Sequence, residues 1–208
     1  MKQPDRTAKP LPSLPGTLGL LALQAGAFVV IGLTLWGFGG PSSASFVSFR
    51  PDEIALGLVL AAILAAVAFA TFKGLPRLSE WLVRAQKDTY AFLLEKPLPL
   101  WAIVVVSLCA GIGEEALFRG GVQTLAANYM PVPLAIILAS ALFAIVHMAK
   151  PPIAAIIFAI GALFGTIYWQ TESLLAVMIG HALYDVFALW YLQKEMHRLN
   201  VFAPEPME

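Results

Sequence analysis

The chain has 208 residues, of which 59% are hydrophobic and 12% are charged, and its thirteen basic residues balance its thirteen acidic ones. Soluble domains are about 45–50% apolar and about 25% charged, so this composition excludes an ordinary soluble domain and indicates an integral membrane protein of one domain. Zero net charge provides no basic surface for nucleic acid, and a single cysteine, Cys109, excludes an internal disulfide.

Six apolar stretches have the length of a membrane span. The first, from Leu18 to Phe38, is longer than the core of a signal peptide and has no small-residue cleavage site after it, so we expect it to be retained. The chain is therefore predicted to be all-α, a polytopic transmembrane bundle with spans at about 17–38, 53–72, 100–119, 132–149, 152–170 and 173–193.

Segment 76–95 differs from the spans because it combines apolar and charged residues at helical spacing. This pattern predicts an amphipathic helix lying in the membrane interface, and the alternative is a connector helix packed on the bundle. The apolar residues that follow the helical spacing are Leu78, Trp81, Leu82, Ala85, Phe92 and Leu93.

The basic residues predict the orientation. If the N-terminus is cytoplasmic, eleven of the thirteen Lys and Arg residues fall on the cytoplasmic side, and only Arg50 and Arg119 do not. Both termini are therefore predicted to be cytoplasmic, and the compact six-span chain is expected in a bacterial inner membrane.

Six ionisable side chains lie in or at the edge of the later spans, where each costs about 2.5–3.5 kcal/mol to insert and usually marks function. With a rise of about 1.5 Å per residue, Glu114, His147, His181 and Asp185 are expected about 15, 22, 12 and 18 Å below the same surface. Three spans thus bring acids and imidazoles to one layer. The six are Glu114, Glu115 and Arg119 on the third span, His147 on the fourth, and His181 and Asp185 on the sixth.

The spacing of these residues predicts separate roles for the two adjacent glutamates. Neighbouring residues on a helix point about 100° apart, so Glu114 and Glu115 cannot face one target. Glu115 and Arg119 have the i,i+4 spacing of an ion pair, with the acid first, and this pair is expected to hold the helix in place. Glu114 is then left to face a cavity.

Two further pairs share the same spacing. His181 and Asp185 are expected on one face of the last span, and the ring of Phe143 is expected to shield His147 from lipid. Such a set suits hydrolysis, because a buried carboxylate is a strong base toward water and imidazole or a protonated acid can stabilise an oxyanion.

A metal mechanism is equally compatible with the sequence. Glu114, His147 and His181 would supply three ligands to Zn²⁺ and leave a position open for water. The cofactor is therefore either Zn²⁺ or none, with water activated by Glu114 alone.

Three motifs now resemble those of a known family. GEEALFRG (113–120) is similar to the EExxxR motif of the CAAX-protease and bacteriocin-processing family of intramembrane proteases, also called the Abi family. FAIVH (143–147) resembles its FxxxH motif, and HALYD (181–185) resembles its final His-x-x-x-Asn/Asp motif. Asp185 stands where the resemblance predicts asparagine in the relatives that process prenylated proteins.

The resemblance implies a helical-bundle endopeptidase that cleaves a membrane-associated protein or peptide. It implies Glu114 as the base, His147 and His181 as essential, and Asp185 as the fourth site residue. Members have been described both as metalloproteases and as glutamate-dependent proteases. The expected organisation is a cytoplasmic tail (1–16), two spans with the connector (17–98), a catalytic core (99–193) and a cytoplasmic tail (194–208).

Two other functions use the same residues. A non-catalytic membrane binding or immunity protein would use the polar residues as a binding pocket. A haem protein or transporter would use the histidines as ligands or the acids as proton relays. The sequence specifies neither the substrate nor the oligomeric state.

Overall fold

The computed structural model describes residues 13–41 and 45–203, and this part of the chain contains helices and no strand. Of the two predicted tails, residues 1–12 and 204–208 lie outside the described part. In chain order the helices are α1 (Leu14–Gly39), α2 (Pro51–Gly74), α3 (Pro76–Ala85), α4 (Lys87–Leu94), α5 (Leu100–Glu115), the π-helix η1 (Ala116–Gln123), α6 (Thr124–Ala126), α7 (Val132–Val146), α8 (Pro151–Thr171) and α9 (Leu174–Arg198).

The prediction of a polytopic helical bundle is confirmed. Among the described residues, five helices are long and apolar enough to cross a membrane, and α7 is a shorter apolar helix. The five are α1, α2, α8, α9 and the continuous helix Leu100–Ala126, which is formed by α5, η1 and α6.

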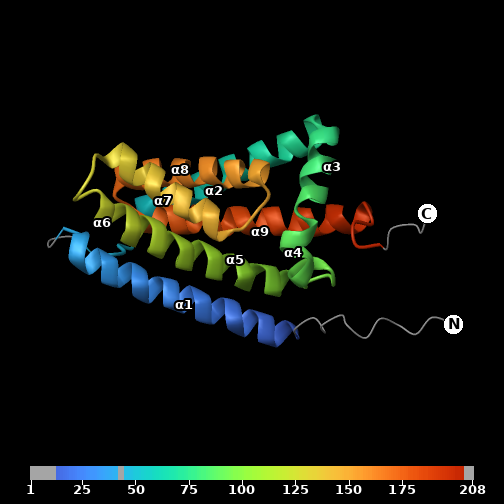
Figure 1. Cartoon of the computed structure of the whole chain (residues 1–208), viewed down its shortest axis with the longest axis horizontal. Helices are drawn as coiled ribbons and strands as arrows, with labels where there is room; N and C mark the ends of the chain where they lie inside the picture. Colours follow the sequence, from blue (N-terminus) through green and yellow to red (C-terminus); the bar gives the residue numbers. More distant parts are fainter. Residues whose placement is uncertain (1–12, 42–44, 204–208) are drawn as a thin grey trace.

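Helices α5 and α9 form the interior of the bundle. Figure 1 shows α5 between α1 and α9, with α7 and α8 on the opposite side from α1. Glycines allow the close contacts: a Cβ on Gly111 would lie 2.6 Å from the backbone N of Ala182 in α9, and one on Gly113 would lie 2.8 Å from Cα of Ala25 in α1. Small residues let helix backbones approach closely in membranes, and here they pack α5 against two neighbours at once.

The start of α9 is fixed by local chemistry. Glu172 has a left-handed backbone (φ 53°) that ends α8, and the Ser173 hydroxyl then accepts a hydrogen bond from the Ala176 N–H at 3.1 Å. A serine cap of this kind satisfies one of the free N–H groups at a helix start. The cap places His181 two turns into α9.

The amphipathic segment 76–95 is not one helix, as the sequence predicted, but two, α3 and α4, divided at Gln86. The break allows Val83 of α3 and both Leu93 and Leu94 of α4 to enter one buried cluster with residues of α5 and α9. The segment therefore packs on the bundle, as the connector alternative expected. Leu78 and Trp81 remain exposed, so contact with the membrane interface stays a prediction for that face.

Candidate active site

Side chains from α5, η1 and α9 meet inside the bundle in a group that we call the polar cluster. Its members are Glu114, Glu115, Arg119, His181 and Asp185. The last span thus contributes its imidazole and acid to the same place as the two adjacent glutamates, although 66 residues separate Glu115 from His181.

Glu115 is fully enclosed and bonded on two sides. Its Oε1 accepts hydrogen bonds from Arg119 Nη1 at 3.0 Å and from His181 Nδ1 at 2.7 Å, and neither Glu115 nor Arg119 exposes any of its side chain. The ion pair with Arg119 has the predicted i,i+4 geometry. The bond to His181 was not foreseen, because the sequence placed that imidazole with Asp185 on one face of the last span.

Glu114 lies on the other side of the same imidazole. Its Oε2 is 3.9 Å from His181 Nε2, and Asp185 Oδ2 is 3.5 Å from that nitrogen. The side chain of Glu114 is 17% exposed and that of Asp185 is 25% exposed, so these two carboxylates lie at the accessible edge of the polar cluster. Two acids therefore face Nε2, while Glu115 holds Nδ1.

Two aromatic rings enclose the buried part of the polar cluster. Phe164 of α8 stacks on the His181 ring with centroids 5.2 Å apart, and Phe143 of α7 stands edge-on to it at 6.1 Å. The Arg119 guanidinium lies 4.7 Å from the Phe143 ring centre and 5.7 Å from that of Phe164. Rings placed this way stabilise the cation and exclude water around it. Phe164 was not identified from the sequence.

His147 occupies the end of α7, next to Phe143. The Phe143 carbonyl is 2.7 Å from His147 Nδ1 and the two rings are 4.7 Å apart. A carbonyl only accepts, so Nδ1 must carry the proton and Nε2 of the neutral ring is left as an acceptor. His147 lies within electrostatic range of Glu114, but among the described residues it forms no ion pair with the acids.

The helix that carries the glutamates changes form directly after them. Residues Ala116–Gln123 form a π-helix where the sequence predicted a continuing α-helix. The Thr124 hydroxyl, at the end of this segment, donates to the Arg119 carbonyl at 3.0 Å. π-Helical segments are rare and occur frequently at functional sites.

The π-helix is bonded to α8 through two glycine carbonyls. Arg119 Nη2 donates to the Gly161 carbonyl and Gln123 Nε2 donates to that of Gly165, both at 2.8 Å. A Cβ on Gly161 would lie 3.2 Å from Arg119 Nη2, and one on Gly165 would lie 2.6 Å from Gln123 Oε1. The glycine spacing in the sequence signals close helix packing. The sequence did not indicate that the groups packed against these glycines would be the polar side chains of Arg119 and Gln123.

The sequence also predicted Glu114, His147 and His181 as ligands of a metal ion. Within residues 13–41 and 45–203, no group of three or more His, Cys, Asp and Glu side chains has an arrangement that could hold a metal ion. His181 Nδ1 is bonded to Glu115 and His147 Nδ1 to a carbonyl, which leaves Nε2 as the remaining nitrogen of each ring. As arranged in the described part of the chain, Glu114, His147 and His181 do not form a Zn²⁺ site.

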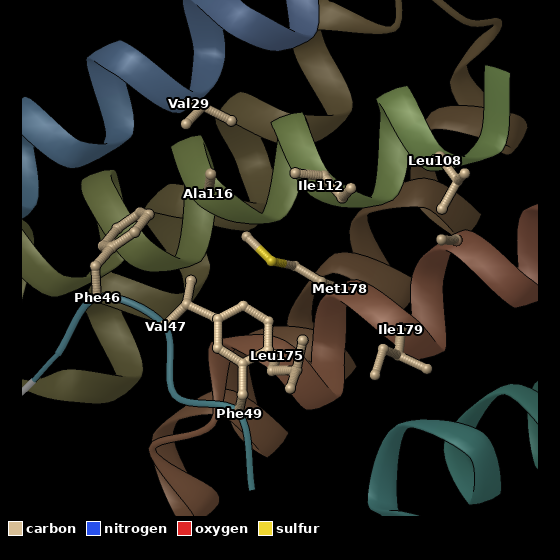
Figure 2. A pocket seen from close by; sticks show the side chains of 11 residues that line it. Val29, Phe46, Val47, Phe49, Leu108, Ile112, Ala116, Leu175, Met178 and Ile179 are labelled. Atoms are coloured by element: carbon tan, nitrogen blue, oxygen red, sulfur yellow. The ribbon is translucent and has the colours of Figure 1, made fainter. Parts of the chain in front are cut away.

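An apolar pocket lies on the other face of α5 and α9. It has a volume of about 300 Å³. Figure 2 shows Ile112 of α5 and Met178 of α9 lining it, with Phe46, Val47 and Phe49 from the connection between α1 and α2 at one side. Ala116 and Ala182, the residues after Glu115 and His181, also line it, so the two α-helices separate the apolar pocket from the polar cluster.

Comparison with known proteins gives one match. Residues 96–187 match the family model described as type II CAAX prenyl endopeptidase Rce1-like, which is slightly less than half of the chain. No curated protein and no solved structure matches. The matched segment contains all three motifs and supports an intramembrane endopeptidase of the CAAX type. The resemblance predicted from those motifs is thereby confirmed: residues 96–187 are similar to the Rce1-like CAAX endopeptidases.

Proposed function

We propose that the protein is an intramembrane endopeptidase in which Glu114 activates water for attack on a peptide bond. One observation carries the proposal: of two adjacent carboxylates, Glu115 is committed to Arg119 and His181, while Glu114 is partly exposed beside His181 Nε2. A general base must lie within hydrogen-bond reach of the water whose proton it takes. The Glu114 side chain is 17% exposed and can meet this requirement, whereas that of Glu115 is fully buried.

His181 is assigned to the oxyanion. Glu115 Oε1 is paired with Arg119 and accepts a hydrogen bond from His181 Nδ1, which fixes the ring. When Nε2 also carries a proton, it is a positioned donor for the oxygen of a tetrahedral intermediate. Asp185, 3.5 Å away, stabilises that charged ring or donates directly when it holds a proton itself.

His147 assists the base. Its Nδ1 is bonded to the Phe143 carbonyl, so Nε2 accepts a hydrogen bond and can orient the attacking water. This role needs the attacking water to lie between Glu114 and His147.

The reaction then balances with these groups alone. Glu114 takes a proton from water as the hydroxyl oxygen bonds to the carbonyl carbon, and the carbonyl oxygen becomes the anion held at His181. The C–N bond breaks as Glu114 returns the proton to the leaving nitrogen. The products are a carboxylic acid and an amine, and the enzyme is regenerated.

The substrate class follows from the surroundings. The site lies within helices of membrane-spanning length, so we propose a membrane-associated protein or peptide as the substrate. A bacterial inner membrane with both termini in the cytoplasm remains our prediction for its location.

The test compares cells that carry the wild type with cells that carry Glu114→Gln, which keeps the shape of the side chain and removes the base. Peptides and protein termini in the membrane fraction are measured by mass spectrometry, with Glu172→Gln, on the exposed turn before α9, as the matched control. We expect one or more cleaved termini to disappear with Glu114→Gln alone.

A contrary result has a clear meaning. If the phenotype and every terminus survive Glu114→Gln at normal protein level, the site is a binding pocket and the proposed reaction is wrong.

A further inference from the structure

His147 is held by a helix with few neighbours. Helix α7 packs mainly against α8 and η1, and His147 is its C-terminal cap. The helix does not pack between α5 and α9. The chain then turns sharply: Met148 is exposed and left-handed (φ 46°), and Lys150 caps α8. We call residues 147–150 the His147 loop.

One side-chain contact ties the His147 loop to another part of the molecule. Lys150 Nζ lies 3.1 Å from Asp88 Oδ2 in the first turn of α4, and we call this ion pair the latch. The two side chains are 55% and 74% exposed. Figure 1 shows α4 beyond the ends of α7 and α8, beside the second half of α9. The latch thus crosses from the connector to the loop that carries a site residue.

The backbone at each end of the latch is firmly held. The Lys150 carbonyl accepts from the N–H groups of Ile153 and Ala154, both at 2.9 Å, at the start of α8. At the end of α4, the Leu94 carbonyl is 3.1 Å from His197 Nε2 of α9, which donates to it. Both ends of the latch therefore lie near backbone groups that are hydrogen-bonded within the bundle.

The connection between α4 and α5 is also fixed to α9. Gln193 accepts from the Leu98 N–H at 2.7 Å and donates to the Leu98 carbonyl at 3.2 Å. These two hydrogen bonds fix the segment that follows the C-terminal end of α4, so α4 is a stable point of attachment for the latch.

Helix α4 also lies beside the accessible edge of the polar cluster. Tyr90 packs against the buried cluster that includes residues of α5 and α9, and so does Val186, the residue after Asp185. Burial, together with the carboxylates of Asp185 and Glu114, raises the pKa of Tyr90. One turn of α4 therefore presents Tyr90 toward the acids and Asp88 toward the His147 loop.

We propose that the Asp88–Lys150 latch positions His147. The latch holds the His147 loop against α4 and so fixes the position of the imidazole relative to Glu114. Asp88 and Lys150 are positioning residues, since neither belongs to the polar cluster. The inference rests on the proposed function for its effect on cleavage, but the effect on the loop itself is independent of any activity.

The first experiment needs no substrate. Amide hydrogen exchange is measured in the purified full chain over peptides that cover residues 143–154, in the wild type, Asp88→Lys, Lys150→Asp and the double variant. An exposed ion pair changes an equilibrium by about two- to five-fold. We expect each single variant to exchange faster by about that factor, and the double variant, which restores the pair with reversed charges, to return to the wild-type rate.

The second experiment measures kcat and KM on the substrate found by the Glu114→Gln comparison. Each single variant should lower kcat about two- to five-fold with KM nearly unchanged, because His147 acts on the reacting water; the double variant should recover. Raising the salt concentration should lower kcat of the wild type toward that of the singles. Glu80→Gln breaks a comparably exposed ion pair with Arg84, within α3, and should change nothing.

The outcomes separate the two proposals. Equal exchange in all four proteins overturns the latch. Faster exchange with unchanged kcat overturns its role in placing His147. Cleavage that persists in Glu114→Gln overturns the proposed function, whereas loss of cleavage there with four equal latch proteins overturns this inference alone.

Discussion

The two faces of the α5–α9 pair contrast sharply. On one face lie the acids, the imidazole and the guanidinium of the polar cluster, and on the other lies an apolar pocket lined by residues such as Ile112 and Met178. Consecutive residues take opposite sides: Glu115 bonds His181, while Ala116 lines the apolar pocket. A helix turns about 100° per residue, so one helix can separate ionic chemistry from apolar surroundings over a single step.

The largest effect is expected from Glu114→Gln. General base catalysis contributes about 10²–10⁴-fold, so cleavage should fall by that factor. Stability should change little, because Glu114 makes no hydrogen bond among the described residues and its Oε2 lies 3.9 Å from His181 Nε2. Cleavage kinetics and thermal unfolding in detergent would test this. A variant that unfolds instead would show that Glu114 belongs to the structural part of the polar cluster.

Glu115→Gln should lower the stability of the protein, in contrast to Glu114→Gln. It leaves the Arg119 guanidinium, which is entirely buried, without its counter-ion. Breaking one partner of a buried pair costs about 3–5 kcal/mol. We expect a lower unfolding temperature and less protein in the membrane, measured beside Glu114→Gln. Equal stability of the two variants would contradict the division of roles between the adjacent carboxylates.

Gly111→Ala tests the close contact between α5 and α9. The added methyl would lie 2.6 Å from the Ala182 N and 2.7 Å from its Cβ, so α5 and α9 must separate. Overpacking of this kind costs about 1–3 kcal/mol. Gly19→Ala in α1, where a Cβ meets nothing within 4 Å, is the matched control and should be neutral or slightly stabilising. Thermal unfolding of both variants decides, and a harmless Gly111→Ala would mean that the helices tolerate a wider spacing.

The smallest effect is expected on the apolar face. Ile112→Ala enlarges the apolar pocket, but the Ile112 side chain is already exposed, so the loss of stability should stay within about 0.5 kcal/mol. Cleavage should match the wild type. A large loss of cleavage in this variant would show that the two faces act together and would break the contrast.

The sequence alone determined the features that depend on local geometry. Apolar stretches fixed the helices, and the four-residue spacing of Glu115 and Arg119 fixed their ion pair, because residues one turn apart on a helix are neighbours whatever surrounds them. The agreement in depth among three spans placed the candidate site residues in one layer, since helix rise per residue is constant.

Only the tertiary structure decided what each of those residues contacts. The bond from His181 to Glu115, the ring of Phe164 on that imidazole and the division of segment 76–95 at Gln86 depend on how each helix is rotated and shifted against its neighbours. Rotation is set by the sum of many packing contacts between distant segments. The sequence of a single helix contains none of that information, and for this reason it predicted candidate site residues without defining their geometry.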